Sequence, residues 1–401
     1  MPKLIVVGSG PVGAVLALGA AQRGMNVVLV EAETVVDETP RAATVHPSTL
    51  AMLGALGLMD DILEQGLVAR YFDFWDRPTR TLIARMDHEV LADLTPYPFV
   101  VQVEQHKIVN MVRDRLAGFD NVEVHLGATV TGVEQAASGV LASAERDGEA
   151  LRLTGDYLIG TDGGRSTVRK GLGIEFEGYT WPERFLVLTT LFDFQQAFPG
   201  CSYRNYLADP EEWVNLFKVA GDGGSGRWRA VFPTGVDETD DQALSDDVVR
   251  RRLGRLAVDA NPAEQLLHRK LYKVHQRVAS AFRGGRMFLA GDAAHVNNPI
   301  GGLGLNCGIH DAVELLDTIS VAAGVDDPVL DRYEARRRTL NIEFVQQQTV
   351  TNKQRLEEVD PDQRKVRFAE LAAIAADPKR ERAFLMRSSL LQSVAKSKTI
   401  G

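Results

Sequence analysis

The sequence predicts an α/β fold that combines a parallel sheet, an inserted antiparallel sheet and a helical C-terminal region. Three observations support this prediction. The chain begins with an apolar strand pattern, a glycine turn and a helix pattern. Apolar and polar residues alternate in short runs over residues 185–233, and nearly everything after Leu303 has helical spacing. These periodicities are typical of buried strands, half-buried strands and helices, respectively.

The N-terminal segment LIVVGSGPVGAVLALGAAQRG carries Gly8, Gly10 and Gly13 between a strand and a helix. In this motif the first glycine permits a tight turn, the second lets the backbone approach a pyrophosphate, and the third lets the helix pack on the strand. The unpaired N–H groups at the helix start attract negative charge. The motif therefore predicts a dinucleotide site.

Glu31 ends the second strand, MNVVLVEA, 18 residues after Gly13. An acidic side chain at this distance can accept hydrogen bonds from the hydroxyls of an adenosine ribose. The competing interpretation is a plain tight turn followed by a solvated strand end. The motif by itself fits both NAD and FAD, because the two share an ADP half.

Composition narrows the classes of partner. With 401 residues, 45% of them hydrophobic, the chain can bury a large core in two or three substructures. The net charge of −9 argues against nucleic acid or an anionic membrane as the main partner. Cys201 and Cys307 lie far apart, and no metal-ligand spacing occurs, so we expect no disulfide and no metal. The start resembles neither a signal peptide nor a membrane span, so we expect a cytoplasmic location.

Element patterns divide the chain into three parts. The nucleotide-binding domain is expected at 1–75, 98–180 and 277–345, the antiparallel sheet domain at 76–97 and 181–276, and the C-terminal helical region at 346–401. Ser48, Ser166 and Ser245 are expected N-caps of helices.

Two further glycine turns follow apolar strands. Asp162 and Gly163 come after YLIG and precede a short helix. The pair Gly291-Asp292 comes after GRMFLA, and a glycine-rich loop from Pro299 to Gly304 leads to a helix beginning near Leu305.

The order G-x-G-x-x-G, D-G, then G-D-A-A-H and P-x-G-G-x-G-x-N resembles the single-component FAD-dependent aromatic hydroxylases related to para-hydroxybenzoate hydroxylase. The resemblance extends to the YEARRR segment at 333–338. It implies a Rossmann-like FAD-binding parallel sheet, an antiparallel sheet that roofs the substrate, and C-terminal helices. Leu303, Leu305 and Cys307 depart from the commonest pattern, and backbone-mediated binding tolerates these changes.

The resemblance also implies a set of FAD contacts. Gly8, Gly10 and Gly13 match the pyrophosphate site, Glu31 the ribose contact and Arg41 the arginine near the diphosphate. The remaining matches are Val12, Gln105, Val130, Asp162, Gly163, Asp292, Gly304, Leu305 and Asn306. Taken singly, Asp162 could form a turn, Asp292 could cap a helix, Arg41 could be a surface cation and Gln105 an ordinary polar residue at a helix start.

Substrate contacts are expected from the antiparallel sheet and from the loop at Pro299. In YRNYL, Tyr203 and Asn205 project to one face, while Arg204 and Tyr206 project to the other. Arg229 lies opposite Trp228 in RWRAVF. An arginine could bind a substrate carboxylate and a tyrosine a phenolate. The sequence does not decide which face looks inward, and it singles out no catalytic base.

The resemblance implies that NADH or NADPH reduces FAD, that O₂ reacts to form a flavin hydroperoxide, and that one oxygen atom passes to a small electron-rich aromatic of the phenolic or hydroxypyridine type. A homodimer is also expected. Alternatives are a flavin halogenase, a lipid reductase, a regulatory FAD-binding protein without catalysis and an NAD-dependent dehydrogenase. The chain has no W-x-W-x-I-P segment of the halogenases and no membrane-seeking helix.

Overall fold

The computed structural model describes residues 1–257 and 260–401. Its parallel sheet has the strand order β18-β19-β12-β1-β2-β8, in which all neighbours are parallel except β18 and β19. The strand bounds are β1 (Lys3–Val7), β2 (Asn26–Glu31), β8 (Val122–Leu126), β12 (Tyr157–Gly160), β18 (Arg283–Gly284) and β19 (Met287–Leu289). Because parallel strands end at the same edge, the turns after β1, β12 and β19 come together there.

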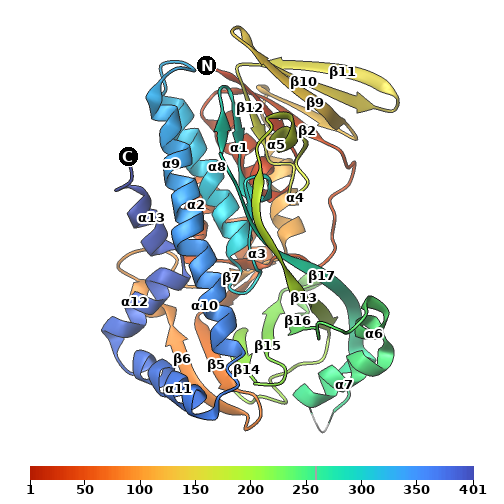
Figure 1. Cartoon of the computed structure of the whole chain (residues 1–401), viewed down its shortest axis with the longest axis vertical. Coiled ribbons are helices and arrows are strands. Elements are labelled where there is room, and N and C mark those ends of the chain that lie inside the picture. Colours follow the sequence, from red (N-terminus) through yellow and green to blue (C-terminus); the bar gives the residue numbers. More distant parts are fainter. Residues whose placement is uncertain (258–259) are drawn as a thin grey trace.

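Three helices pack together beside this sheet. Helix α1 (Pro11–Gln22) packs against α4 (Gln105–Leu116) and α8 (Leu303–Val321). The apolar face predicted for α4 is buried, at Ile108, Met111, Val112 and Leu116. A three-stranded antiparallel sheet of β9 (Thr129–Ala136), β10 (Gly139–Arg146) and β11 (Glu149–Gly155) projects beside the parallel sheet (Figure 1).

The inserted sheet has eight strands in the order β20-β17-β13-β16-β15-β14-β5-β6. Its neighbours are antiparallel except for β14 and β5, which are parallel. The strand bounds are β5 (Tyr71–Asp76), β6 (Thr81–Asp87), β13 (Phe176–Thr190), β14 (Arg204–Ala208), β15 (Val214–Val219), β16 (Arg227–Pro233), β17 (Leu266–Ala279) and β20 (His295–Val296). The long strands β13 and β17 run from the upper part of the molecule into this sheet (Figure 1).

The domain boundaries drawn from the sequence stay a prediction. Strand β5 pairs within the inserted sheet from residue 71, five residues before the expected boundary at 76, and β13 and β17 extend across the boundaries at 181 and 276.

The two faces of the inserted sheet bury different cores. Leu186, Leu207 and Trp228 lie on one face and pack against α7 (Asp246–Leu256). Phe72, Tyr206 and other residues of the opposite face pack with Ile300 and with α11 (Pro361–Ala375) and α12 (Pro378–Ser388). Figure 1 shows these two helices beside β5 and β6. The inner face is therefore the one that carries Tyr206.

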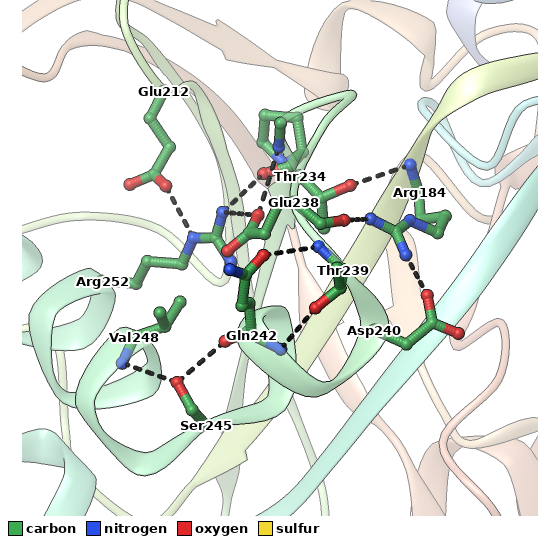
Figure 2. Close-up of polar contacts among 12 residues, drawn as sticks. Arg184, Glu212, Thr234, Glu238, Thr239, Asp240, Gln242, Ser245, Val248 and Arg252 are labelled. Carbon is green, nitrogen blue, oxygen red and sulfur yellow. Dashed lines mark hydrogen bonds and ion pairs between the residues drawn. The ribbon is translucent and has the colours of Figure 1, made fainter.

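Polar contacts fasten α7 and its neighbour α6 (Asp240–Leu244) to the outer part of the sheet (Figure 2). Buried Arg252 pairs with Glu212 at 2.7 Å and with Glu238 at 2.9 Å. Ser245 accepts a hydrogen bond from the Val248 N–H and so caps α7, which confirms the predicted cap.

The remaining elements complete the chain. They are β3 (Thr44–Val45), β4 (Leu67–Ala69) and β7 (Val100–Gln102), which form a small sheet, and α2 (Pro47–Ala55), α3 (Met59–Gln65), α5 (Thr167–Gly171), α9 (Asp331–Leu340), a π-helical stretch (Asn341–Gln346), α10 (Gln347–Leu356) and α13 (Leu391–Ser397), with single 3₁₀ turns at His88–Leu91, Asp222–Gly224, Pro262–Gln265, Gly291–Ala293 and Pro328–Leu330. Across residues 1–257 and 260–401, no helix has the length and apolar character needed to cross a membrane.

One predicted cap is wrong. Helix α2 starts at Pro47 with His46 as its N-cap, because a proline suits the first helical position. The Ser48 hydroxyl instead donates to the Ser389 oxygen at 2.7 Å.

Candidate active site

The three predicted turns meet at one edge of the parallel sheet. The Thr161 hydroxyl, directly after β12, donates to the Gly8 oxygen at 2.8 Å and joins the first turn to the second. Arg169 of α5 joins the second turn to the third, since its guanidinium donates to the oxygens of Gly164 and Ala293, each at 2.8 Å. Sequence reasoning missed both Thr161 and Arg169, because their role depends on which strand ends are neighbours.

The glycines of the first turn show different constraints. Gly8 has φ +98°, and a Cβ there would lie 2.6 Å from the Thr161 oxygen. A Cβ on Gly13 would overlap the Gly8 oxygen, whereas a Cβ on Gly10 would have no atom within 4 Å. Helix α1 also has no side-chain cap and no acidic residue in its first turn. An open approach at Gly10, beside free N–H groups, fits the diphosphate of a dinucleotide.

Val12 packs where α1 meets the third turn and α8. A Cβ on Gly291 would lie 2.8 Å from a Val12 methyl group, and a Cβ on Gly308 would lie 2.5 Å from it. Gly308 therefore lets α8 approach the first turn closely. A glycine inside an apolar helix pattern is the signal that could have identified it.

Glu31 contacts the first turn directly, whereas Arg41 lies in an exposed segment. The Glu31 carboxylate accepts hydrogen bonds from the N–H groups of Ser9, at 2.6 Å, and Glu33, at 3.0 Å. Its oxygens keep further lone pairs for a ligand. The Arg41 side chain is exposed and pairs with Asp37 at 2.7 Å.

Asp162 caps α5. Its carboxylate accepts hydrogen bonds from the N–H groups of Thr167, at 2.7 Å, and Val168, at 3.1 Å, and from the Ser166 hydroxyl at 2.6 Å. Ser166 accepts from the Arg169 N–H at 2.9 Å, which confirms the predicted Ser166 cap. The contacts of Asp162 are therefore those of a residue that forms a turn and caps a helix. The neighbouring Gly163 has open space at its Cβ position.

Asp292 projects from the third turn with an exposed side chain between buried Gly291 and Ala293. Surrounding protein nevertheless raises the pKa of this carboxyl through desolvation, although nearby His295 and Arg41 act in the opposite direction. The side chain is therefore accessible to solvent although protein atoms surround it.

A buried ion network holds this turn from behind. Asp311 of α8 accepts hydrogen bonds from the Gly291 N–H at 3.0 Å and from His295 at 2.6 Å, and it pairs with Arg337 of α9 at 2.6 Å. Burial opposes ionisation of Asp311, but His295 and Arg337 outweigh it and lower its pKa. Sequence reasoning missed Asp311 and Arg337.

The loop that starts at exposed Pro299 leads into α8, which begins at Leu303, two residues before the expected start. The Asn306 side chain accepts from the His46 N–H at 2.9 Å and donates to the oxygens of Thr44 and Gly302, at 2.8 Å and 2.6 Å. Gly304 has open space at its Cβ position, while Leu305 is buried. The first turn of α8 has neither a side-chain cap nor an acidic residue.

Two predicted cofactor residues have fewer contacts. Gln105 is the first residue of α4, and its N–H donates to the Ala42 oxygen at 3.1 Å, next to Arg41. Val130 is buried in β9 opposite Ala144 of β10. No hydrogen bond in the described residues joins these two side chains to the three turns.

The predicted substrate residues separate between the two faces of the inserted sheet. The strand register places Arg204 and Arg229 on either side of Phe217, so all three share the inner face with Tyr206. Tyr203 lies apart from them. The Lys218 ammonium is 5.5 Å from the Tyr203 ring and 5.7 Å from the Trp228 ring, which puts Tyr203 on the outer face.

Arg229 and Arg204 have different partners on the inner face. Arg229 donates to the Arg41 oxygen at 2.8 Å and thereby fastens the segment that carries Arg41. Arg204 is 5% exposed, and its guanidinium lies 3.9 Å from the centre of the Phe72 ring. Among residues 1–257 and 260–401 its Nη1 atom has no hydrogen-bond partner and the guanidinium forms no ion pair, but the Tyr206 hydroxyl lies close enough to interact with it.

The neighbours of Arg204 are neutral. Burial, together with the charge of Arg204, lowers the pKa of His88 to about 4 and that of His46 well below its usual range. Burial also raises the pKa of Tyr206, and the charge of Arg204 with hydrogen bonding to Arg204 and to the Gly301 backbone partly offsets this effect.

Comparison with known proteins agrees with this geometry. A family model described as "FAD binding domain" matches residues 2–348. Para-nitrophenol 4-monooxygenase of a Pseudomonas species is 36% identical over 369 residues, which cover 90% of this chain and 89% of that protein. The 6-hydroxy-3-succinoylpyridine 3-monooxygenase of Pseudomonas putida is 32% identical, over 90% of this chain and 91% of that protein.

The crystal structure of p-nitrophenol 4-monooxygenase from Pseudomonas putida has a TM-score of 0.88 and 33% identity, and the match covers 96% of this chain and 98% of that one. The converging turns, the roofing sheet and these relatives agree with one another. The chain belongs to the family of FAD-dependent aromatic hydroxylases.

Proposed function

We propose that this enzyme hydroxylates a small phenolic or hydroxypyridine-type aromatic with electrons from NADH or NADPH, inserting one oxygen atom of O₂ and releasing the other as water. The observation that supports the substrate class is buried Arg204, which has no carboxylate partner among the described residues, beside Tyr206 on the inner face of the roofing sheet. Relatives named for nitrophenol and hydroxypyridine substrates support this class.

The first turn fits the FAD diphosphate best. Gly8, Gly10, Val12 and Gly13 would form the cradle, Glu31 would bind the adenosine ribose, and exposed Arg41 would approach the diphosphate. We assign Gln105, Val130, Asp162, Gly163 and Asp292 to the rest of the cofactor. When bound, FAD supplies the redox chemistry that links NAD(P)H, O₂ and the ring.

The start of α8 is suited to the flavin ring. Gly304, Leu305 and Asn306 lie in its first turn, where backbone N–H groups have no partner in the helix. A helix N-terminus acts as roughly half a positive charge, so these groups would stabilise negative charge on the reduced ring. The Asn306 side chain, fixed by three hydrogen bonds, would keep this turn in place.

The substrate would lie between the α8 loop and the inner sheet face. Arg204 and Tyr206 would bind its polar end, Pro299 would line the loop side, and Arg229 would act by holding the Arg41 segment. Buried Phe72 and Ile300 would exclude water, which protects the oxygen transfer from wasteful release of H₂O₂. Tyr203 lies on the outer face, away from this site.

A screen of small hydroxylated aromatics and pyridinols tests the reaction. We expect some members to accelerate NAD(P)H oxidation by the FAD-loaded enzyme and to yield a product with one added oxygen atom that originates from ¹⁸O₂. NAD(P)H oxidation that no aromatic accelerates, with H₂O₂ as its product, would contradict the proposal.

Location and assembly remain proposals. A supply of reduced nicotinamide nucleotide and two unpaired buried cysteines favour the cytoplasm. We also propose a homodimer with no nucleic-acid partner, which sedimentation of the purified enzyme would test.

A further inference from the structure

A chain of two side-chain amides runs from α12 along α10. Arg387 of α12 donates from its Nε atom to the Gln348 side-chain oxygen at 2.7 Å. The Gln348 Nε2 atom donates in turn to the Asn352 Oδ1 atom at 2.9 Å, one helical turn along α10. A guanidinium has donors only, so Arg387 fixes which end of each amide points towards it. The Asn352 Nδ2 donor therefore points away from Gln348.

The free end of this amide chain lies against the loop that opens α8. The Asn352 Nδ2 atom is 3.0 Å from the position that a Cβ on Gly301 would take. Tyr206 lies beside the same Gly301 backbone, and α10 packs against β14, the strand that carries Tyr206 (Figure 1). Among residues 1–257 and 260–401, Nδ2 donates no hydrogen bond, and the side chain is only partly buried. An unused donor thus lies beside the proposed substrate position.

The charge around this donor favours an acceptor as its partner. Arg355 follows Asn352 by three residues on α10 and acts on Tyr206 from there. It forms no ion pair within the part of the chain that the structure describes, and the charge of Glu370 only partly offsets the burial that lowers its pKa. A hydrogen-bond donor next to a positive charge selects a group that accepts hydrogen bonds and carries full or partial negative charge.

We propose that Asn352 binds an acceptor substituent on the aromatic ring of the substrate, such as a nitro, carboxylate or carbonyl group, and that Gln348 positions Asn352 for this contact. The inference rests on the proposed function and narrows its substrates to aromatics that carry such a group in addition to the ring hydroxyl or ring nitrogen. Arg387 acts through Gln348, because reversing the Gln348 amide would reverse Asn352 as well.

The test measures binding of three phenols to the FAD-loaded enzyme without NAD(P)H, under anaerobic conditions at pH 6. 4-Nitrophenol carries an acceptor opposite its hydroxyl, 4-isopropylphenol carries an apolar group of similar shape, and 4-aminophenol carries a donor. Changes in flavin absorbance report each dissociation constant. Free 4-nitrophenol is mainly un-ionised at this pH, so differences among the three phenols report the ring substituent.

Asn352→Leu removes the donor and keeps a side chain of similar size. A hydrogen bond of ordinary strength corresponds to about threefold to tenfold in affinity. We expect 4-nitrophenol to bind more weakly to the variant by about this factor, while 4-isopropylphenol binds as tightly as before or more tightly. The flavin content of the same samples shows whether the variant is folded and loaded.

Gln348→Glu tests the positioning role. The new carboxylate still accepts from Arg387 but cannot donate to Asn352, so the Asn352 amide should reverse and present its oxygen to the ligand. We expect 4-nitrophenol to bind about threefold to tenfold more weakly, and 4-aminophenol to bind more tightly by a similar factor. Asn352→Asp, which offers only acceptors at this position, should show the same reversal. Gln347→Glu, on the exposed face of the same helix, should change neither affinity.

Two results would overturn the inference. One is an equal loss of 4-nitrophenol and 4-isopropylphenol binding in Asn352→Leu, and the other is the wild-type order of affinities for the three phenols in Gln348→Glu and Asn352→Asp. Either result, with phenols that still bind, would leave the proposed function standing. Failure of all three phenols to perturb the flavin of the wild-type enzyme would contradict the substrate class itself.

Discussion

Gly10 and Gly13 lie three residues apart in one turn, yet an added methyl group meets open space at the first and the Gly8 oxygen at the second. Gly10→Ala should therefore leave the fold intact and weaken FAD binding by roughly tenfold, about 1.4 kcal/mol. Gly13→Ala should lower the free energy of unfolding by about 1 to 3 kcal/mol through overpacking. FAD titration and urea unfolding of both variants measure the two effects.

Gly254→Ala is the matched control, because Gly254 lies inside α7 with nothing within 4 Å of its Cβ position. We expect it to keep FAD affinity and to gain about 0.5–1 kcal/mol of stability from helix propensity. Equal FAD affinity in Gly10→Ala and Gly254→Ala would contradict the assignment of Gly10 to the diphosphate.

Asp162 offers a second test at this scale. Removing its carboxylate in Asp162→Ala deprives the Thr167 and Val168 N–H groups of their acceptor. Loss of a helix cap costs about 0.5–2 kcal/mol. The midpoint of urea unfolding should fall accordingly. The midpoint of Asp162→Asn, which retains one acceptor oxygen, should fall less than that of Asp162→Ala. An unchanged midpoint in both variants would exclude the capping role.

Local motifs predicted residues whose roles arise within a few positions of the chain. The glycine turn, Glu31 and the Ser166 cap belong to this group. The roles of Thr161 and Arg169, and the lack of a carboxylate partner at Arg204, depend on contacts between distant segments, so no local pattern reveals them.

At the scale of elements, the network of Asp311, His295 and Arg337 joins α8, α9 and the third turn. Arg337→Leu would remove one of the two ion partners of the buried Asp311 carboxylate and leave it with His295, and breaking a buried ion pair typically costs about 3–5 kcal/mol. Urea unfolding should show this loss, and the double variant Asp311→Leu with Arg337→Leu should recover part of it.

The exposed pair of Arg23 and Asp317 on the other side of α8 serves as control. Arg23→Leu should cost at most about 1 kcal/mol, as for surface ion pairs. Similar losses in Arg23→Leu and Arg337→Leu would show that the buried network has no special role.

Periodicity predicted most elements but not how they pair. The inserted sheet and the apolar face of α4 follow from alternation and helical spacing. The parallel pairing of β14 with β5 joins segments about 130 residues apart, as their register at Asn205 and Asp73 shows, and periodicity carries no information about such partners. The inner face of the sheet likewise became clear only from what packs on it.

At the scale of the whole molecule, buried neutral histidines make the fold sensitive to acid. Burial lowers the pKa of His310 to about 3 and that of His88 to about 4, from 6.5. Below pH 6.5 the unfolded chain binds more protons than the folded one, so stability falls as the pH drops towards these values. Each such histidine contributes about 1.4 kcal/mol per pH unit in this window.

His310→Gln should reduce this dependence. We expect the difference in unfolding free energy between pH 7.5 and pH 5 to be smaller in the variant than in the wild-type enzyme. An equal or larger difference would show that His310 is charged in the folded protein, against its burial between Ser48 and Thr49.

The account depends most on the convergence of three turns from distant segments around a single FAD. Titration of the purified chain with FAD, followed by flavin quenching and by the absorbance of protein separated from free ligand, tests this directly. We expect saturation at one FAD per chain and a yellow protein. A chain that stays folded but colourless at high FAD concentration would contradict the account.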